Sequence, residues 1–492
     1  MLPLQQLTQA INRAFGDRLT AIAVCDLARH KPEFSAGRAI TQRQIICALI
    51  VMVLCVCVFI FAGGITHYVL SGVLAVCFAA NAGLRALLTW KGAGEHSPMD
   101  EPVCATPFSG RELEWPIYTI IVPMYREANV MANLVHAILA LDYPRNRLDV
   151  KLVLEADDAQ TYAAAKEYAR DPCFEIIRVP PSQPRTKPKA ANYALQFARG
   201  AYIVIYDAED RPEPDQLKKA LAMFRQSPDN VACLQARLNF YNADENWLTR
   251  MFALDYALWF DFLLPGLDRL GIPMPLGGTS NHFRTQALRA IHGWDPYNVT
   301  EDADIGIRLS QMGFRVRTLD STTYEEAVTQ LGVWLGQRSR WMKGYIQTWL
   351  VHMRKPRALL HNAGAHGFAG FQLFVGGTPL AALLNPLLWL LFCVSLVIYG
   401  PAALTAGGGG VALCGLILGN ALFTYLMMLG VLRRGWLSLA PFGLCAPLYW
   451  LLISVAAYRG VFELLYKPWH WQKTDHGLSR ITPPNQIMQA GS

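Results

Sequence analysis

Apolar residues gather in long runs near both ends of the chain, and only short apolar runs occupy its middle. Residues 45–62 form one uncharged run, and residues 69–88 form a second whose only charge, Arg85, lies near one end, where a long side chain can reach the membrane surface. Further apolar stretches follow at 368–399, 411–432 and 437–458. Because a helix of about 20 apolar residues spans the hydrocarbon core of a bilayer, these runs predict an integral membrane protein.

The charges around the first two runs predict how this membrane hairpin is oriented. The connecting residues 63–67 contain no Lys or Arg, whereas the opposite side of the pair is flanked by Arg29, Lys31, Arg38, Arg43 and Lys91. Loops rich in Lys and Arg stay in the cytoplasm. Both ends of the hairpin, and with them the middle of the chain, are therefore expected in the cytoplasm.

The stretch 368–399 is too long for one straight span. At about 1.5 Å per residue it would measure about 48 Å, against a hydrocarbon core of about 30 Å. Breakers such as Gly376 and Pro386 interrupt it, so either an interfacial or re-entrant piece is joined to one span, or the stretch makes two short crossings. The tail with Lys467 and Lys473 is expected in the cytoplasm, which requires two crossings here, or one crossing here and another stretch that does not cross.

Between about residues 115 and 355, short β-branched runs alternate with longer amphipathic segments. Buried strands are expected at 118–122, 149–154, 174–179 and 201–206. The alternation is typical of a mostly parallel sheet covered by helices. The expected order along the chain is an N-terminal cytoplasmic or interfacial segment 1–43, a transmembrane hairpin 44–90, an α/β domain with interface helices 91–367, a transmembrane region 368–458 and a short tail 459–492.

Acidic residues directly follow two of the expected strands. Asp157 and Asp158 come after the second strand, and Asp207, Glu209 and Asp210 come after the fourth. Ligands of α/β sheets bind at the carboxyl ends of strands, and carboxylate oxygens select hard divalent cations, so the second group is expected to hold Mg²⁺ or Mn²⁺ against a diphosphate. Alternatively, Asp207, Glu209 and Asp210 only cap the helix that follows them, and Asp157 and Asp158 only form a solvated turn.

Cations and a second acidic pair follow further along the domain. Arg185 and Lys187 lie just before an expected helix. Together with the N-terminus of that helix, the two cations could bind an anion. Alternatively, they are ordinary solvated loop residues. Thr300, Glu301 and Asp302 open another helix, as ordinary capping residues would. Capping does not require the second acid, and a carboxylate here could take the proton from an attacking hydroxyl.

The string Gln337-Arg338-Ser339-Arg340-Trp341 closes this series of motifs. The Arg340 guanidinium suits phosphate oxygens, and the Trp341 indole offers a flat face for a sugar ring. The alternative is an amphipathic helix with Trp341 packed and the arginines solvated.

Composition narrows the class of partner. The chain has 492 residues, of which 53% are hydrophobic and 16% charged, and its net charge is +7. A chain this apolar is not wholly soluble. No basic run is interleaved with a nucleic-acid module, so the positive charge is assigned to a face near lipid and to phosphate sites, and no nucleic acid is expected as a partner.

In this order, the motifs resemble the processive family 2 glycosyltransferases, which include cellulose, curdlan, hyaluronan and chitin synthases. The resemblance covers about residues 116–341, with membrane segments on both sides as in those synthases. It is carried by the strings V-P-M-Y-R-E (122–127), A-D-D (156–158), K-P-K-A-A-N (187–192), D-A-E-D (207–210), G-G-T-S-N (277–281), T-E-D (300–302) and Q-R-S-R-W (337–341).

The resemblance implies an α/β GT-A fold, Rossmann-like and nucleotide-sugar-binding, inserted between transmembrane helices. It also implies inverting, metal-dependent transfer from a nucleotide-sugar donor, UDP-glucose or a related UDP-sugar, onto a growing β-linked polysaccharide that is threaded across the bilayer. Export or regulatory partner proteins fit the same scheme.

By motif match, Asp302 would be the general base. The residues implied for the nucleotide-sugar are Glu127, Asp157, Asp158, Lys187, Asp207, Gln337, Arg338 and Arg340. Those implied for the acceptor are Thr279, Asn281, Glu301 and Trp341. The metal would bind Asp207, and because the usual D-x-D is D-x-E-D here, either Glu209 or Asp210 would be its second ligand.

Two other functions compete with polymer synthesis. A non-processive transferase would add one sugar to a lipid or lipid-linked acceptor, and an inactive export or scaffold protein would not transfer sugar at all. The complete Q-x-x-R-W string and helices on both sides favour the polymerase, and the intact series of acids argues against an inactive protein.

Overall fold

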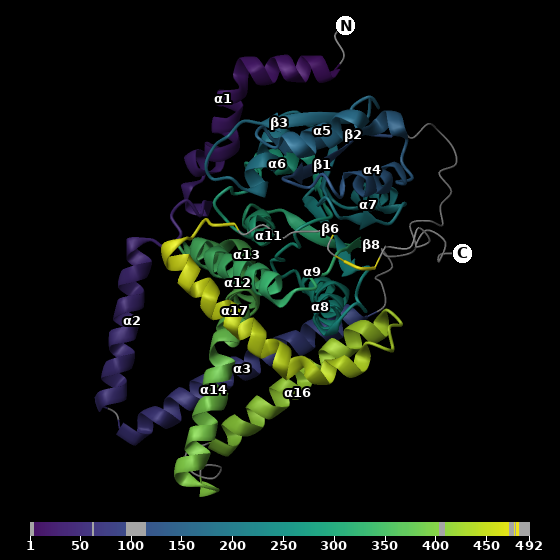
Figure 1. Cartoon of the computed structure of the whole chain (residues 1–492). Coiled ribbons are helices and arrows are strands. Elements are labelled where there is room, and N and C mark those ends of the chain that lie inside the picture. The colour runs from purple at the N-terminus through teal and green to yellow at the C-terminus, as the bar shows by residue number, and fades with distance from the viewer. Residues whose placement is uncertain are drawn as a thin grey trace.

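The computed structural model of this chain describes residues 4–61, 63–94, 115–402, 409–471, 477 and 479–481. Figure 1 shows an α/β domain at one end of the molecule and long apolar helices at the other. These long helices are α2 (Gln42–Phe61), α3 (Gly63–Ala93), α14 (Gly377–Tyr399) and α16 (Gly409–Arg433). The predicted division into an α/β middle and apolar helical flanks is therefore present in the structure.

One eight-stranded sheet with the order β3-β2-β1-β4-β7-β6-β8-β5 forms the centre of the domain. β1, β2, β3 and β4 run parallel, whereas β7 is antiparallel to both of its neighbours. The strands are β1 (Tyr118–Met124), β2 (Leu148–Glu155), β3 (Phe174–Val179), β4 (Tyr202–Ile205), β5 (Arg211–Pro212), β6 (Val231–Phe240), β7 (Asn281–Arg284) and β8 (Arg315–Glu325).

The four strands expected from the sequence are the first four strands of this sheet. β2 is buried along its whole length and β1 along most of it, which agrees with their continuous apolar runs. The sequence analysis did not predict β5, β6, β7 or β8. β7 is short and polar, and β8 is mainly polar, with Val316 and Leu319 among Arg, Thr, Asp and Ser residues. Two of its hydroxyls, those of Ser321 and Thr323, accept hydrogen bonds from the buried Gln216 side chain.

Helices cover both faces of the sheet and continue toward the apolar end. Those of the domain are α1 (Leu4–His30), α4 (Met131–Leu139), α5 (Ala159–Tyr168), α6 (Lys187–Leu195), α7 (Gln216–Gln226), α8 (Trp247–Leu258), α9 (Leu264–Leu270), α10 (Thr285–Ala290), α11 (Glu301–Gln311) and α12 (Leu331–His352). They are followed by α13 (Pro356–Phe371) and α17 (Ala446–Tyr466). α8 passes into α9 through a π-helical turn at Trp259–Leu263.

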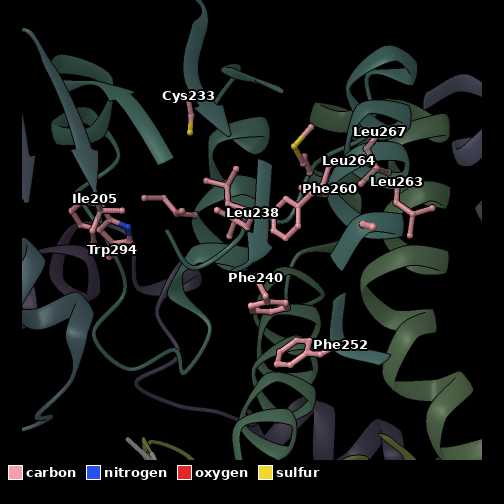
Figure 2. Close-up of a cluster of buried hydrophobic side chains, with 14 of the residues drawn as sticks. Ile205, Cys233, Leu238, Phe240, Phe252, Phe260, Leu263, Leu264, Leu267 and Trp294 are labelled. Carbon is pink, nitrogen blue, oxygen red and sulfur yellow. The ribbon is translucent and has the colours of Figure 1, made fainter. Parts of the chain in front are cut away.

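The core of the domain continues into the helices below it. In Figure 2, Phe240 at the end of β6 lies beside Phe252 of α8, and their ring centroids are 4.5 Å apart. The same cluster includes Leu263, Leu264 and Leu267, next to α3.

Two glycines let α3 touch this region backbone to backbone. A Cβ atom at Gly92 would lie 2.0 Å from the carbonyl oxygen of Phe262, and one at Gly266 would lie 2.2 Å from that of Leu88. The end of α3 is therefore packed tightly against the domain.

The stretch 368–399 forms one apolar helix joined to an interfacial piece. α13 lies along the lower side of the domain in Figure 1, a π-helical turn follows at Gln372–Gly376, and α14 then runs without a break through Pro386. The alternative with two short crossings is wrong for this structure.

Three helical stretches in the described residues are long and apolar enough to cross a membrane: Pro356–Ile398, Leu416–Arg433 and Ala440–Tyr466. The third, which contains α17, nevertheless contacts the domain at both ends. Arg250 lies 4.6 Å from the ring centroid of Phe442, just before α17, and Lys343 of α12 pairs with Glu463 near its end at 3.2 Å. α17 thus lies along the domain instead of leading away from it.

The N-terminal helix and the described tail also contact the domain. Asn12 of α1 donates to the carbonyl of Arg178 on β3 at 2.7 Å, and the amide of Ser479 donates to Glu326 at 2.7 Å. With α17 beside the domain, α1, the domain and the described residues of the tail lie on one side of the apolar helices. Lys473 lies outside the described residues, and the cytoplasmic location of this side stays a prediction.

Candidate functional site

A cavity of about 500 Å³ lies between the sheet and the apolar helices. Its walls come from the carboxyl ends of several strands, from α8, α11 and α12, and from α3, α14, α16 and α17. Predicted site residues that line it are Glu127, Lys187, Asp207, Glu209, Glu301, Asp302, Gln337, Arg338, Arg340 and Trp341. Motifs that are far apart in the sequence therefore meet in one space.

Asp207 and Glu209 lie at the end of β4 and line the cavity, whereas Asp210 does not. The Asp210 carboxylate is buried and accepts hydrogen bonds from the amide of Asp207, at 2.7 Å, and from the hydroxyl of Thr279. These bonds hold the turn in shape. None of the three acids caps the following helix, because α7 begins at Gln216, after Asp215.

The acids around Glu209 repel one another electrostatically. Burial, Asp207 and Glu127 raise the pKa of Glu209 well above its ordinary value. Burial also raises the pKa of Glu325, at the end of β8, and Asp210, Glu209 and Asp207 raise it further. A hard divalent cation would relieve this repulsion, so Asp207 and Glu209 fit a Mg²⁺ or Mn²⁺ site.

Lys187 supplies the cation nearest to these acids. It is the first residue of α6, and its ammonium forms an ion pair with Asp207 and donates to the carbonyl of Gly278 at 2.7 Å. Burial opposes its charged form, but Asp207 and Glu301 outweigh burial and raise the pKa of Lys187 above its ordinary value. Lys187 therefore stays charged beside the acidic group.

Glu301 and Asp302 form the first turn of α11 and line the cavity. Thr300 precedes the helix, but its side chain makes no capping hydrogen bond. Instead it packs against α12, where a Cβ atom at Gly344 would lie 2.2 Å from the Thr300 hydroxyl. This close contact fixes the start of α11 next to the Gln337–Trp341 string on α12.

Burial changes the protonation of both acids. It raises the pKa of Asp302, against the effects of the Ala303 amide and of Lys187 and Arg340. Burial and Asp302 raise the pKa of Glu301 to about 7. Because a raised pKa increases the affinity of a carboxylate for a proton, either group is suited to act as a base near neutral pH.

The two arginines of α12 have different surroundings. Arg338 pairs with Asp255 at 2.6 Å and donates to the Tyr449 hydroxyl at 2.7 Å. Arg340 donates to the carbonyl of Val299 at 3.3 Å, and its guanidinium lies 5.6 Å from the ring centroid of Trp471. Arg338 is thus held in an ion pair, while Arg340 has no ion-pair partner in the described part of the chain.

Trp341 lies on the cavity wall within an aromatic group. Its ring stacks on Tyr256 with a centroid distance of 6.2 Å, and Phe252 meets it edge-on at 5.8 Å. The Arg338 guanidinium lies 4.6 Å from the ring centroid of Trp341. The indole is therefore both packed on neighbours and partly open to the cavity.

Four other predicted residues do not line the cavity. Asp158 caps α5 by accepting from the amide of Thr161 at 3.1 Å, and Asp157 forms an exposed ion pair with Arg185. Thr279 and Asn281 are buried, and their side chains hydrogen bond within the domain: Thr279 to Asp210, and Asn281 to the carbonyl of Gly277 at 2.8 Å.

Two residues at the cavity were missed or misread in the sequence. Glu325 is the last residue of β8, and the mainly polar pattern of β8 hid that strand. Arg85 does not reach for the membrane surface: it lines the cavity and donates to the hydroxyl of Thr378 at 2.8 Å. An isolated charge inside an apolar run was the available signal.

Comparison with known proteins agrees with this geometry. Residues 116–344 match the family described as "Glycosyltransferase like family 2". The beta-monoglucosyldiacylglycerol synthase of Trichormus variabilis is 27% identical over 243 residues, which are 48% of this chain and 50% of that protein. Glucomannan 4-beta-mannosyltransferase 2 of Arabidopsis thaliana is 28% identical over 244 residues, which are 47% of this chain and 44% of that protein. The chain spans about half the length of these curated relatives.

Among solved structures, the chain is similar to a mannosyltransferase from Pyrobaculum calidifontis in complex with GDP-Man and Mn²⁺. The identity is 20% and the TM-score 0.48, with 81% of this chain and 99% of that chain covered. The parallel strands, the acids at their carboxyl ends and the match of residues 116–344 to this family model together show that this part of the chain has a GT-A-like fold.

Proposed function

We propose that this protein transfers a sugar from a nucleotide-sugar, with inversion at the anomeric carbon, onto a hydroxyl of an acceptor bound in the cavity. The observation that carries the proposal is the meeting of Asp207 and Glu209, Asp302 and Arg340 around one cavity. These groups supply the negative ligands, the base and the cation that such a transfer requires.

The donor end of the site is formed by the acids and by Lys187. Asp207 and Glu209 would hold Mg²⁺ or Mn²⁺, which when bound neutralises charge on the donor diphosphate. Arg340, together with Gln337 and the more constrained Arg338, faces the cavity and would bind the diphosphate as it leaves. Glu127 lies on the same wall, and Asp157 and Asp158, outside the lining, would bind the nucleoside only at its rim.

Asp302 is the proposed general base. Its carboxylate takes the proton from the attacking acceptor hydroxyl while that oxygen forms a bond to the anomeric carbon. The bond from this carbon to the diphosphate breaks with its electron pair, and a nucleoside diphosphate leaves. Attack from the face opposite the leaving group inverts the configuration.

The shape of the cavity supports a polymer as the product. Beyond Trp341, the lining continues to side chains of α3, α14 and α16, so an extended acceptor has room away from the donor. We propose a UDP-sugar such as UDP-glucose as donor, and a β-linked polysaccharide that passes across a bacterial inner membrane from a cytoplasmic domain. Trp341 would stack on its terminal sugar, next to Glu301.

Transfer of a single sugar to a lipid acceptor is the second candidate. The observation in its favour is that the cavity walls include helices that are apolar enough to lie in a bilayer. An inactive scaffold fits less well, because the acids and arginines of the motifs are kept together around the cavity.

The test uses purified full-length protein, a panel of radiolabelled nucleotide sugars and sizing of the products. A ladder or a high-molecular-weight product supports polymerisation, and a product that migrates as a lipid with one added sugar supports the second candidate. Absence of transfer from every donor, with nucleotide binding intact, would overturn the proposal. Asp302→Asn protein is the matched inactive control.

A further inference from the structure

Arg85 is a cation placed within an apolar helix at the far end of the cavity. It lies eight residues before the end of α3, about 12 Å along the helix axis. Its guanidinium donates to the Thr378 hydroxyl at 2.8 Å and to the Asn81 side-chain oxygen at 3.3 Å. Two rings flank it, with centroids 5.6 Å away for Phe374 and 5.3 Å away for Phe423.

These contacts are all with neutral groups, and the Asp255 carboxylate acts on the charge of Arg85 only from beyond ion-pair distance. Among the described residues, no carboxylate forms an ion pair with Arg85. Asp255, which lines the same cavity, is paired with Arg338. A guanidinium has five N–H donors, and only two hydrogen bonds to neutral side chains are formed here. An unpaired cation among apolar helices is costly, so such residues usually mark a binding site.

The surroundings of Arg85 are those of a ligand head group. Polar side chains from four helices line this end of the cavity: Asn81, Thr378, Asn385, Asn420 and Ser454. The side-chain oxygen of Asn385 is buried and has no hydrogen-bond partner within the described structure. It would accept a hydrogen bond from a hydroxyl of a bound molecule.

Apolar side chains surround this polar group. Phe78, Ala381, Ala382, Phe423 and Met427 belong to the same lining. A molecule bound here therefore meets both a fixed positive charge and surfaces that suit an alkyl chain.

We propose that Arg85 binds the phosphate of a lipid acceptor, whose head group extends beyond this phosphate and presents the acceptor hydroxyl to Asp302. The inference rests on the second candidate of the proposed function, transfer to a lipid acceptor, because it assigns the part of the cavity lined by the apolar helices to that lipid. An anion is required by the unpaired guanidinium, phosphate suits its planar fork, and a lipid suits the position between α3, α14 and α16.

The experiment compares two probes with the same alkyl chain that differ only in the phosphate group: tritium-labelled farnesyl phosphate and farnesol. Binding to immobilised full-length protein is measured in maltoside micelles, which carry no phosphate. We expect farnesyl phosphate to bind at least about ten-fold more tightly than farnesol, the size expected for one charge-assisted contact. Inorganic phosphate at the same concentration should not displace it. This comparison needs only the wild-type protein.

Variants then assign the effect to Arg85. Arg85→Gln should lose the preference for farnesyl phosphate, and Arg85→Lys, which keeps the charge but not the planar fork, should retain part of it. Lys91→Gln is the matched control, because Lys91 is an exposed cation on the same helix that does not line the cavity. It should bind farnesyl phosphate as the wild type does.

Binding of UDP to the same proteins separates this inference from the proposed function. If Arg85→Gln protein binds UDP normally but no longer prefers farnesyl phosphate to farnesol, the result supports both the lipid-phosphate site and the transferase proposal. Equal binding of the two probes by wild-type protein, with UDP binding intact, would overturn the lipid-phosphate site and leave the transferase proposal standing. Displacement by inorganic phosphate, or tighter binding of a glucuronate oligosaccharide, would overturn the lipid as the source of the anion.

Discussion

Replacing Asp302 with Asn tests the proposed base most directly. The change removes one negative charge and almost no volume, and an amide oxygen can still accept the hydrogen bond that Asp302 receives from Ala303 at 2.7 Å. General-base catalysis is worth about two to four orders of magnitude. At about 1.36 kcal/mol per decade, the barrier should rise by about 2.7 to 5.4 kcal/mol.

The structure also predicts what this variant keeps. Burial raises the pKa of Asp302, so the folded protein holds its proton more tightly than the unfolded chain does, and this residue lowers stability as the pH rises. Removing the charge should therefore leave the melting temperature at neutral pH unchanged or higher. Affinity for UDP should be unchanged as well, because the diphosphate is assigned to other residues.

The assay measures initial transfer rates, UDP affinity and melting temperature for wild-type, Asp302→Asn and Glu301→Gln proteins. Wild-type activity should fall as the pH is lowered, because protonated Asp302 cannot accept a proton from the acceptor. Asp304 is not a substitute base, since it is buried and pairs with His352 at 3.0 Å and with Arg308 at 3.3 Å. A folded Asp302→Asn protein with a rate within a few-fold of wild type would refute the assignment.

Four further predictions concern the rest of the site and the orientation. EDTA should abolish transfer and Mg²⁺ or Mn²⁺ should restore it, because Asp207 and Glu209 leave excess negative charge in the cavity; undiminished activity after verified removal of metal would contradict this. Glu209→Gln should lose metal-dependent turnover at an unchanged or higher melting temperature, whereas Asp210→Ala should destabilise the fold by about 1–3 kcal/mol, because it removes the buried acceptor of two hydrogen bonds. Arg340→Ala should weaken UDP binding about ten-fold or more, while Trp341→Ala should shorten the product at normal UDP affinity; a well-folded Trp341→Ala protein that elongates normally would remove its role at the acceptor. Reporter fusions after Lys473 should read cytoplasmic, and an extracytoplasmic reading would refute the predicted topology.

The sequence alone determined the architecture and the chemistry of the motifs. Buried parallel strands need continuous apolar runs, and long uncharged runs have few alternatives to apolar helices, so the α/β middle and its helical flanks were visible in the order of residues. The acids after β2 and β4, together with the Gln337–Trp341 string, pointed to sugar transfer because strand ends and residue types are both local properties.

Only the tertiary structure decided which of these residues share a space. Glu209 and Asp210 are neighbours in sequence, and their difference comes from Thr279, which lies on a distant segment and binds Asp210. Arg338 and Arg340 differ for a similar reason, since α8 and α17 bring Asp255 and Tyr449 to the first of them.

The same holds for Arg85 and for α17. In the sequence, Arg85 is one charge in an apolar run, and the position of its guanidinium beside Thr378 depends on how α3 packs against α14. α17 has the composition of a span, but its contacts with α12 lay it along the domain. Composition fixes the environment that a helix tolerates, and only packing between segments distant in sequence fixes where the helix lies and which side chains meet.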